Sequence, residues 1–223
     1  MDIKTENIIK SGSYSVTITK FNRLTFVSLY RGKSKFHHLC FASEEILRLF
    51  LCLDLKKEGG KEIIQKLVEW CDVIVANMRP DALERLGLDA TTIRSKNPEK
   101  IYCLITGYGT DGPYSGLPTY DSVLQGASGI AGLTMARDGK PAYVPMLICD
   151  HVVGEITAGT VMAALMQRQN TGTGASIEIP MFETMASFVL QEHLSQQSFS
   201  PPVGPPGDLR LLSPHNQPVK TKD

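Results

Sequence analysis

The chain has 223 residues, in which 23 Lys and Arg balance 23 Asp and Glu. This length is enough for one large domain or two small ones, each with its own hydrophobic core. A net charge of zero excludes the broad basic surface that holds nucleic acid or anionic membrane, so an anionic ligand would need a few placed groups. A hydrophobic content of 42% and a charged content of 21% are typical of globular proteins rather than disordered ones.

The cysteines and the N-terminus set the expected compartment. The five cysteines are an odd set without a CxxC pair, which argues against a disulfide framework or a zinc site and favours the cytoplasm. His37 and His38 have no acidic or cysteine partner at ligand spacing, so we expect no metal site. Residues 1–6 are too polar for a signal peptide, and no apolar run is predicted to reach membrane-spanning length.

Residues 1–50 form a first segment of uncertain fold. Residues 14–19 and 24–30 have the composition of β-strands, and a basic patch follows from Arg31 to His38. The apolar stretch 45–52 suits a helix or a strand equally. The segment contains no motif that indicates chemistry.

Residues 51–198 show an alternation of strands and helices that is typical of an α/β core. Buried strands are expected at 51–55, 72–76, 101–106 and 176–179. Helices are expected from Gly59, with Ile63, Ile64, Leu67 and Val68 on one face, and at 81–86, 120–130, 152–168 and 181–195. Gly87 is expected to end the helix at 81–86.

The C-terminal segment, residues 199–223, differs in composition from the core. Six prolines lie between Pro201 and Pro218, so the segment cannot form a helix or a central strand. We interpret it as an extended arm or a truncated linker.

Two loops follow buried strands and are candidates for ligand binding, since ligands of open α/β sheets lie beyond the carboxyl ends of the strands. The first is Asn77-Met-Arg-Pro, where Arg79 supplies a positive charge; an ordinary turn with Pro80 at the first helical position explains it too. The second is the glycine-rich loop 107–118, which lacks the spacing of a dinucleotide or P-loop motif. A merely long connection remains the alternative for that loop.

A third candidate is Asp150, at the predicted start of the helix at 152–168. A carboxylate there can accept backbone N–H bonds, and the helix dipole would keep it ionised. The alternative is a plain N-cap without a chemical role. From the residues alone, the chain is an α/β protein with loops of a size that could bind a ligand.

Ordered sequence blocks carry a resemblance over about residues 51–221. They are Leu53-Asp-Leu-Lys, Asp72 to Leu88, Asn97-Pro-Glu-Lys-Ile-Tyr-Cys, Gly107-Tyr-Gly-Thr-Asp-Gly-Pro-Tyr, Pro118-Thr-Tyr-Asp, Gln125-Gly-Ala-Ser-Gly, and the run from Asp150 to Arg168-Gln-Asn-Thr-Gly-Thr-Gly. In this order and spacing they resemble class III CoA-transferases, the superfamily of formyl-CoA transferase, carnitine CoA-transferase and α-methylacyl-CoA racemase. The resemblance implies a Rossmann-like, open, mostly parallel sheet with flanking helices, here incomplete relative to the family.

The resemblance also implies a reaction. Family members move CoA from an acyl-CoA donor to a carboxylic acid acceptor, with no permanently bound cofactor. An aspartate carboxylate attacks the donor thioester to form a mixed anhydride, CoA thiolate converts this to an aspartyl-CoA thioester, and the acceptor resolves it. Asp150 matches this nucleophile. Acyl-CoA and a small carboxylic acid are therefore the expected substrates.

Other positions match by the same resemblance. The positions that would line CoA are Leu53, Lys56, Asn77, Met78, Arg79, Arg85, Leu86 and Met181. Tyr120 matches a tyrosine beside the acyl group, where the related racemases have a histidine base. A phenol with its usual pKa near 10 is a poor base at neutral pH, so Tyr120 favours transfer over racemisation.

Two departures from the family lead to the alternatives. Residues 1–50 lack the family's opening βα unit, and the chain stops at Asp223 within a stretch that the family continues. We therefore expect a fragment, which as a full-length protein would form an interlocked homodimer. An acyl-CoA racemase and an inactive remnant that at most binds CoA or a partner are the alternative functions. A mitochondrial location stays open beside the cytoplasmic one, although no transit peptide is evident.

Overall fold

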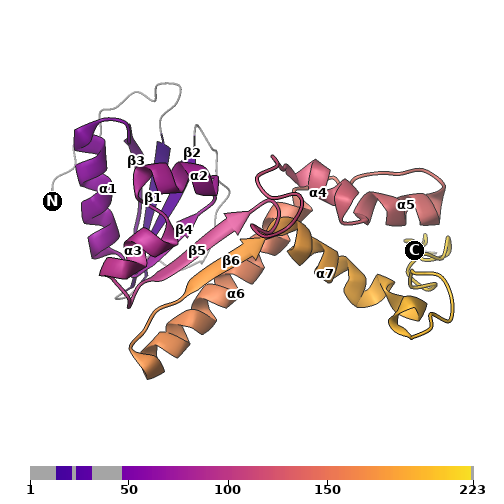
Figure 1. Cartoon of the computed structure of the whole chain (residues 1–223). Coiled ribbons are helices and arrows are strands. Elements are labelled where there is room, and N and C mark those ends of the chain that lie inside the picture. Colours follow the sequence, from indigo (N-terminus) through magenta and orange to yellow (C-terminus); the bar gives the residue numbers. More distant parts are fainter. Residues whose placement is uncertain (1–13, 22–23, 32–46, 222–223) are drawn as a thin grey trace. The chain divides into compact units, whose positions relative to one another are not determined.

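The computed structural model describes residues 14–21, 24–31 and 47–221, with side chains from Leu53 onward (Figure 1). The chain forms two compact units. Unit 1 comprises Met1–Thr106 and Ile156–Ile179, and unit 2 comprises Gly107–Glu155 and Pro180–Asp223. The chain therefore passes from one unit to the other three times.

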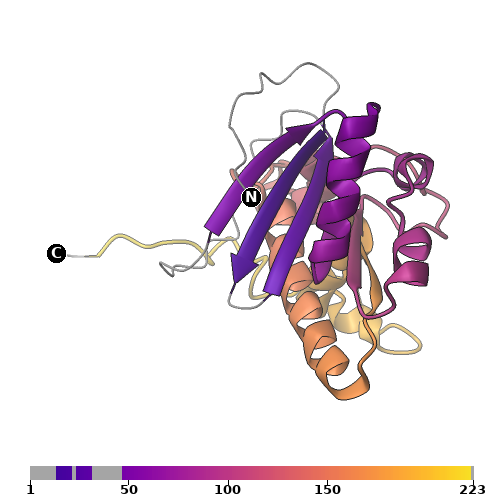
Figure 2. The ribbon, with the colours of Figure 1, turned by 90° about the vertical axis from the view of Figure 1, so that its left-hand side faces the viewer.

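Unit 1 is built on a mixed sheet with the strand order β3-β1-β2-β4-β5-β6. The strands are β1 (Tyr14–Phe21), β2 (Leu24–Arg31), β3 (Leu47–Leu53), β4 (Val73–Ala76), β5 (Ile101–Thr106) and β6 (Ser176–Pro180). β1 is antiparallel to both of its neighbours, whereas β2, β4 and β5 form a parallel set. β3 therefore points in the same direction as the parallel set, and Figure 2 shows it beside β1 and β2.

The sheet confirms the α/β prediction. The stretches 14–19 and 24–30 lie in β1 and β2, and the apolar stretch 45–52, which suited helix or strand, supplies strand β3. The antiparallel β1 makes the sheet mixed, and its parallel part is the three strands β2, β4 and β5. The closer description as Rossmann-like stays a prediction.

The helices α1 (Glu58–Trp70) and α2 (Pro80–Leu86) pack their apolar side chains into the core of unit 1. In α1, Ile64 and Val68 are buried and Leu67 packs against the core, as predicted. The prediction was wrong for Ile63, which is 40% exposed, because the next residue along a helix is rotated away by about 100°. α2 starts with Pro80 and ends at Gly87, whose φ of 66° is left-handed, as predicted.

A third helix of unit 1, α3 (Ala90–Lys96), was not predicted. Its N-cap is Asp89, whose carboxylate accepts the backbone N–H of Thr92 at 2.9 Å. The sequence carried this capping signal, but the run that follows it is short and has only one buried residue, Ile93. Leu88, just before this helix, is tied to strand β5, because the buried hydroxyl of Tyr102 donates to the carbonyl of Leu88 at 2.7 Å.

Helix α6 (Ile148–Thr171) contributes its first residues to unit 2 and the remainder to unit 1. It begins four residues before the predicted start and ends three residues after the predicted end. Among the described residues it is the one helix long and apolar enough to cross a membrane, which corrects the expectation that no such run exists. This is weak evidence by itself, because a core helix meets the same criteria, and Val161 and Leu165 of α6 are buried.

Unit 2 contains α4 (Asp121–Ala127), α5 (Ile130–Asp138), α7 (Met181–His193) and the short 3-10 helix η1 (Ser195–Ser198). One helix was predicted at 120–130, but α4 ends at Ala127 and α5 begins anew after Gly129. Gly129 has a φ of 96°, which interrupts a helix and suits only glycine well. The helix α7 confirms the prediction at 181–195 to within two residues.

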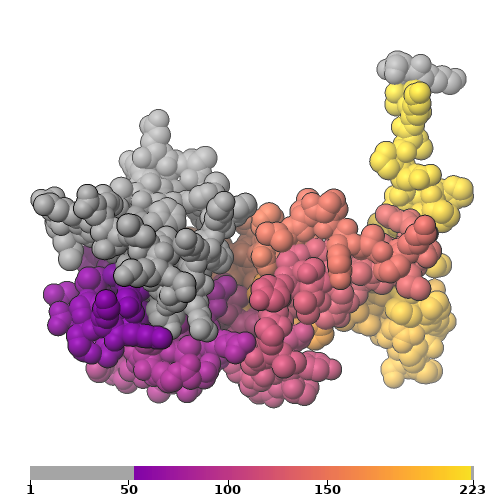
Figure 3. Space-filling view, turned by 90° about the horizontal axis from the view of Figure 1, so that it is seen from above, coloured from indigo at the N-terminus to yellow at the C-terminus, as the bar shows by residue number. Residues whose placement is uncertain are grey.

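The C-terminal segment forms no helix or strand over residues 199–221, as its prolines predicted. Its first part is bonded to the end of α7 and to η1. The N–H of Gly207 donates to the carbonyl of His193 at 2.8 Å, and the N–H of Asp208 donates to Nδ1 of His193 at 3.2 Å. The last described residues extend away from the rest of unit 2 (Figure 3).

Candidate functional site

The carboxyl ends of the strands in unit 1 present three polar side chains. β3 ends at Leu53 and β4 ends at Ala76, and both strands point the same way, so the segments that follow them leave the sheet at one edge. Lys56, Asn77 and Arg79 lie in these segments and are exposed. Neither Lys56 nor Arg79 forms an ion pair with any residue that the structure describes, so both cations are available to an anion.

The apolar members of the predicted CoA site lie differently. Leu53 and Met78 are buried in the core of unit 1, and Leu86 packs against it half-buried. Their side chains hold the strand-end loops to the core. A ligand at this edge would meet their backbone groups rather than their side chains.

Arg85 has a competing partner. Its guanidinium donates to the carboxylate of Asp81 at 2.8 Å, one turn earlier on α2, and both side chains are exposed. This contact lowers the pKa of Asp81 below its ordinary value, chiefly through the hydrogen bond. Arg85 would have to leave Asp81 to bind a phosphate, whereas Arg79 would not.

In unit 2, Asp150 lies in the first turn of α6 rather than before it. The helix begins at Ile148, so the N-cap alternative for Asp150 is wrong. The carboxylate of Asp121 accepts the N–H of Cys149 at 2.8 Å and of Asp150 at 3.2 Å. Asp121, at the start of α4, therefore caps a helix that begins 27 residues later in the chain.

The Asp150 carboxyl is exposed, and among the described residues its oxygens accept no hydrogen bond. Its pKa lies above the ordinary value, first because the surrounding protein reduces its hydration and second because Asp121 is negatively charged. His151 opposes both effects weakly. Reduced hydration and Asp121 thus act against the expectation that the helix start would hold Asp150 ionised. The neighbouring thiol of Cys149 is buried, and its pKa is raised to about 12.

A buried amide fixes the capping carboxylate. Gln125 is 2% exposed and Asp121 is 7% exposed. Nε2 of Gln125 donates to Oδ1 of Asp121 at 2.6 Å and to the carbonyl of Met146 at 3.2 Å. Oε1 of Gln125 accepts the N–H of Val144 at 2.8 Å. One side chain thus joins α4, the segment 144–146 and, through Asp121, the start of α6.

The glycine-rich loop 107–118 is tied to the start of α7, which argues against a merely long connection. The N–H of Gly109 donates to Glu183 at 2.9 Å, and the N–H of Phe182 donates to the carbonyl of Gly107 at 3.0 Å. The ring of Tyr108 lies 5.5 Å from that of Phe182. A side chain at position 107 would clash with Thr119, so the turn requires glycine there.

Two further predicted residues flank this loop. Tyr120 directly follows it and precedes Asp121, with 74% of its surface exposed. Met181 is the first residue of α7 and is half-buried. The predicted site residues therefore form two groups: Tyr120, Asp150 and Met181 belong to unit 2, and the other seven belong to unit 1.

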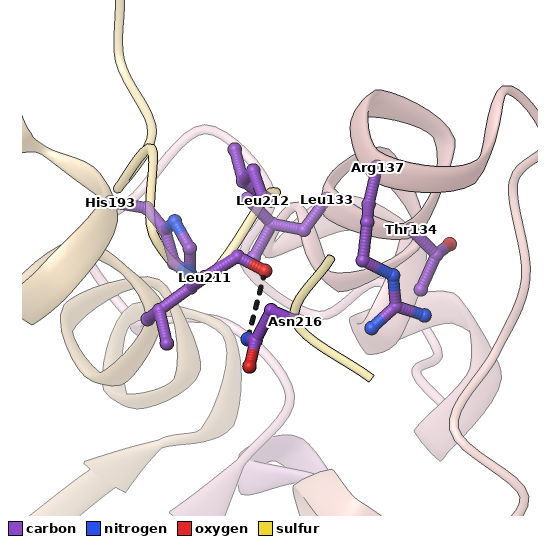
Figure 4. A pocket seen from close by; sticks show the side chains of 7 residues that line it. All are labelled: Leu133, Thr134, Arg137, His193, Leu211, Leu212 and Asn216. Carbon is purple, nitrogen blue, oxygen red and sulfur yellow. Dashed lines mark hydrogen bonds between the residues drawn. The ribbon is translucent and has the colours of Figure 1, made fainter. Parts of the chain in front are cut away.

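A cavity of about 260 Å³ lies elsewhere in unit 2, and no predicted residue lines it (Figure 4). Arg137 reaches it from α5, His193 from the end of α7 and Asn216 from the C-terminal segment. The guanidinium of Arg137 is bonded to the carboxylate of Asp138 at 2.7 and 2.8 Å. With its cation paired in this way, the cavity offers weaker anion binding than the strand ends of unit 1.

Comparison with known proteins decides the family. The family model "CoA-transferase family III" matches residues 28–223. The chain belongs to CoA-transferase family III. Succinate–glutarate CoA-transferase of Agrobacterium fabrum is 32% identical over 142 residues, which are 64% of this chain and 36% of that protein. Formyl-CoA:oxalate CoA-transferase of Streptomyces avermitilis is 37% identical over 131 residues, which are 59% and 32% of the two chains.

Solved structures agree with this assignment. A CAIB/BAIF family protein from Brucella suis superposes with a TM-score of 0.63 at 30% identity, over 70% of this chain and 42% of that chain. The chain thus spans only about a third of the length of its curated family III relatives. The family match begins at residue 28, within β2, whereas the sequence blocks carried the resemblance only from about residue 51.

The sequence interpretation did not predict the structural roles of three residues of this family III chain: the capping Asp121, the amide of Gln125 and the loop-holding Glu183. Asp121 and Gln125 are spaced i, i+4, which places them on one face of a helix, and this spacing could have indicated the pair. No sequence signal identified Glu183, because its bond to Gly109 joins residues 74 positions apart.

Proposed function

We propose that this chain carries the acyl-transfer carboxylate and a CoA-binding edge of an enzyme that moves CoA from an acyl-CoA donor to a small carboxylic acid. The observation that carries the proposal is Asp150. Its carboxyl group is exposed without a hydrogen-bond partner among the described residues, on a helix start whose amides another carboxylate occupies. The oxygens of an ordinary capping residue would accept hydrogen bonds from those amides.

The chemistry asked of Asp150 is nucleophilic catalysis. An Asp150 oxygen attacks the thioester carbonyl of the donor, forms a mixed anhydride and releases CoA as thiolate. The thiolate attacks the Asp150 carbonyl carbon of the anhydride, forms an aspartyl-CoA thioester and releases the donor acid. The acceptor carboxylate attacks this thioester to give a second anhydride and CoA thiolate, which then forms the new acyl-CoA and frees Asp150.

The raised pKa of Asp150 suits this role in one respect. A carboxylate that the surrounding protein makes less hydrated, and that accepts no hydrogen bond, is a better nucleophile than one held by several donors, provided that it is ionised at the working pH. The shift is caused by reduced hydration and by Asp121, both of which raise the energy of the free anion. Anhydride formation removes that charge.

The basic groups at the strand ends of unit 1 are proposed to bind the nucleotide of CoA. Arg79 and Lys56 are exposed and have no ion-pair partner in the described part of the chain. Charge-assisted hydrogen bonds from such groups to phosphate are each worth about 1.5–3 kcal/mol. Arg85 would contribute less, since binding a phosphate would cost it the contact with Asp81.

Tyr120 bears on the choice between transfer and racemisation. It lies next to Asp121, 74% exposed, and a phenol hydroxyl donates or accepts a hydrogen bond more readily than it removes an α-proton. This favours the transferase over an acyl-CoA racemase. The names of the relatives suggest dicarboxylic acids as first acceptors to try: glutarate and succinate for one, oxalate for another.

The test mixes the chain with succinyl-CoA and glutarate, or with formyl-CoA and oxalate, and follows the new acyl-CoA by mass spectrometry. Transfer that needs both the acid and Asp150 is expected. Deuterium uptake at the α-carbon of a branched acyl-CoA without any acceptor would instead indicate a racemase. Binding of CoA with neither reaction would indicate a remnant without turnover.

A further inference from the structure

The amide of Gln125 has a fixed orientation. Its oxygen accepts the N–H of Val144 at 2.8 Å, and its nitrogen donates to the carbonyl of Met146 at 3.2 Å. A third backbone contact, from the nitrogen to the carbonyl of Val144 at 3.4 Å, agrees with the same orientation. Turning the amide over would set oxygen against two carbonyls and nitrogen against an N–H, so backbone groups decide which end faces α4.

This orientation dictates what position 121 must be. The NH2 group of Gln125 faces Oδ1 of Asp121 at 2.6 Å, so residue 121 has to present an acceptor there. Oδ2 of Asp121 has to accept as well, because the N–H groups of Cys149 and Asp150 point to it. A carboxylate meets both requirements, whereas an asparagine would set its own NH2 group against one of these donors.

We propose that Gln125 is a positioning residue for Asp150: it locks the Asp121 carboxylate under the first turn of α6 and so fixes where the Asp150 carboxyl lies. This rests on the proposed function, in which Asp150 is the acyl carrier. Gln125 is buried and contacts no substrate in this scheme. It acts through Asp121, which holds the backbone of Asp150 itself.

Removing the amide should therefore change the surroundings of Asp150. Methionine has a side chain of similar length to glutamine but without the amide. In Gln125→Met, Asp121 therefore loses its side-chain donor, and the segment 144–146 loses its bonds to residue 125. The Asp121 carboxylate is then free to turn away from α6, and its repulsion of Asp150 weakens. The other influences on the pKa of Asp150 are its reduced hydration and His151, and the substitution replaces neither group.

The first measurement does not require turnover. Titration of the Asp150 carboxyl by carbon NMR, with the signal assigned through Asp150→Asn, should give a lower midpoint in Gln125→Met than in the parent chain. Gln167→Met makes the same chemical change at an exposed site of α6 and should leave the midpoint where it was. A folded Gln125→Met chain with the parent's Asp150 midpoint would overturn the proposal.

The second measurement uses catalysis. A displaced carboxylate should lower kcat by about 10- to 100-fold, since misplacement by about 1 Å has effects of that size. KM for acyl-CoA should stay within about twofold, because the basic groups proposed to bind the nucleotide of CoA belong to unit 1 and a misplaced nucleophile affects the chemical step. A rise in KM with kcat unchanged would count against positioning. The two proposals can fail separately. If the parent chain forms no covalent acyl or CoA adduct on Asp150, yet Gln125→Met still lowers the titration midpoint of Asp150, the proposed function fails while the positioning of Asp150 stands.

An exchange of the two residues covers the case in which Gln125→Met does not fold. In Asp121→Asn with Gln125→Glu, the NH2 group of Asn at position 121 would donate to the carboxylate at 125, and its single side-chain oxygen would still accept from α6. The exchange should unfold at a higher temperature than Gln125→Glu alone, which sets two carboxylates face to face, whereas both variants place a carboxylate oxygen at position 125 near the carbonyl of Met146. An exchange variant that is no more stable than Gln125→Glu alone would refute the proposed role.

Discussion

The two candidate regions of this family III chain use polar groups in opposite ways. At the strand ends of unit 1, Lys56 and Arg79 are exposed on loops that the hydrophobic core holds through Leu53 and Met78. In unit 2, the decisive polar groups Asp121 and Gln125 are buried and satisfied by each other and by the backbone. The contrast agrees with the two proposals, in which the first region binds a charged ligand and the second positions one carboxyl group.

The largest expected effect on stability lies in unit 2. Asp121→Ala would leave the N–H groups of Cys149 and Asp150 and the Gln125 amide without their acceptor. Loss of a helix cap together with buried donors left unsatisfied should lower the free energy of unfolding by about 2–4 kcal/mol. Urea titration followed by circular dichroism measures this. A loss below that of an exposed control such as Asp111→Ala would show that the network is not needed for the fold.

The next effect belongs to unit 1 and concerns binding rather than folding. Arg79→Ala should weaken CoA binding by about 1.5–3 kcal/mol, or roughly 10- to 100-fold, with little change in stability because the side chain is exposed. Arg85→Ala is the matched variant and should lose less. Calorimetric titration of CoA into both variants separates them. If Arg79→Ala binds as tightly as the parent chain, the nucleotide lies elsewhere.

A smaller effect is the pH dependence of Asp150. Its folded pKa is raised, so its contribution to stability is present below the unfolded pKa and is lost as pH rises through the folded pKa. Asp150→Asn removes the carboxyl group and, with it, the loss of stability that its ionisation causes. At neutral pH the unfolding temperature of Asp150→Asn should therefore lie higher, relative to that of the parent chain, than it does at acidic pH. Thermal unfolding of both proteins at the two pH values measures this difference. A relative loss at neutral pH would mean that the ionised carboxyl is stabilised in the fold.

The smallest expected effect tests the pairing of Arg85. Asp81→Asn removes the charge that holds the guanidinium, and the stability change should be slight because both side chains are exposed. If Arg85 binds CoA phosphates once it is released, this substitution should tighten CoA binding slightly. Unchanged affinity in Asp81→Asn, combined with unchanged affinity in Arg85→Ala, would remove Arg85 from the CoA site.

Sequence patterns predicted the strands and most helices of unit 1 because burial alternates there with a clear period. The strand Val73–Ala76 and the helix face of Ile64 and Val68 are local features of this kind. The same patterns joined α4 and α5 into one helix, because nothing local showed that Gly129 takes a left-handed conformation. Sequence similarity, rather than periodicity, supplied the family and Asp150.

The arrangement around Asp150 could not be predicted, because long-range bonds create it. Asp121 caps a helix that begins 27 residues later in the chain, and Gln125 bonds to Val144 and Met146, which lie 19 and 21 residues away. The sequence placed Asp150 at a helix start, with a plain N-cap as the alternative to a chemical role. The structure gives the capping role to Asp121 and leaves the Asp150 carboxyl exposed.

Covalent labelling of Asp150 tests the central claim most directly. The chain is mixed with succinyl-CoA, trapped with hydroxylamine or borohydride, digested and examined by mass spectrometry, with Asp150→Asn as the matched control. The account predicts a modification on Asp150 in the parent chain, none in Asp150→Asn, and comparable stability of the two proteins. A modification on Asp121 or Glu155 with Asp150 untouched, or equal labelling of the Asp150→Asn variant, would contradict it.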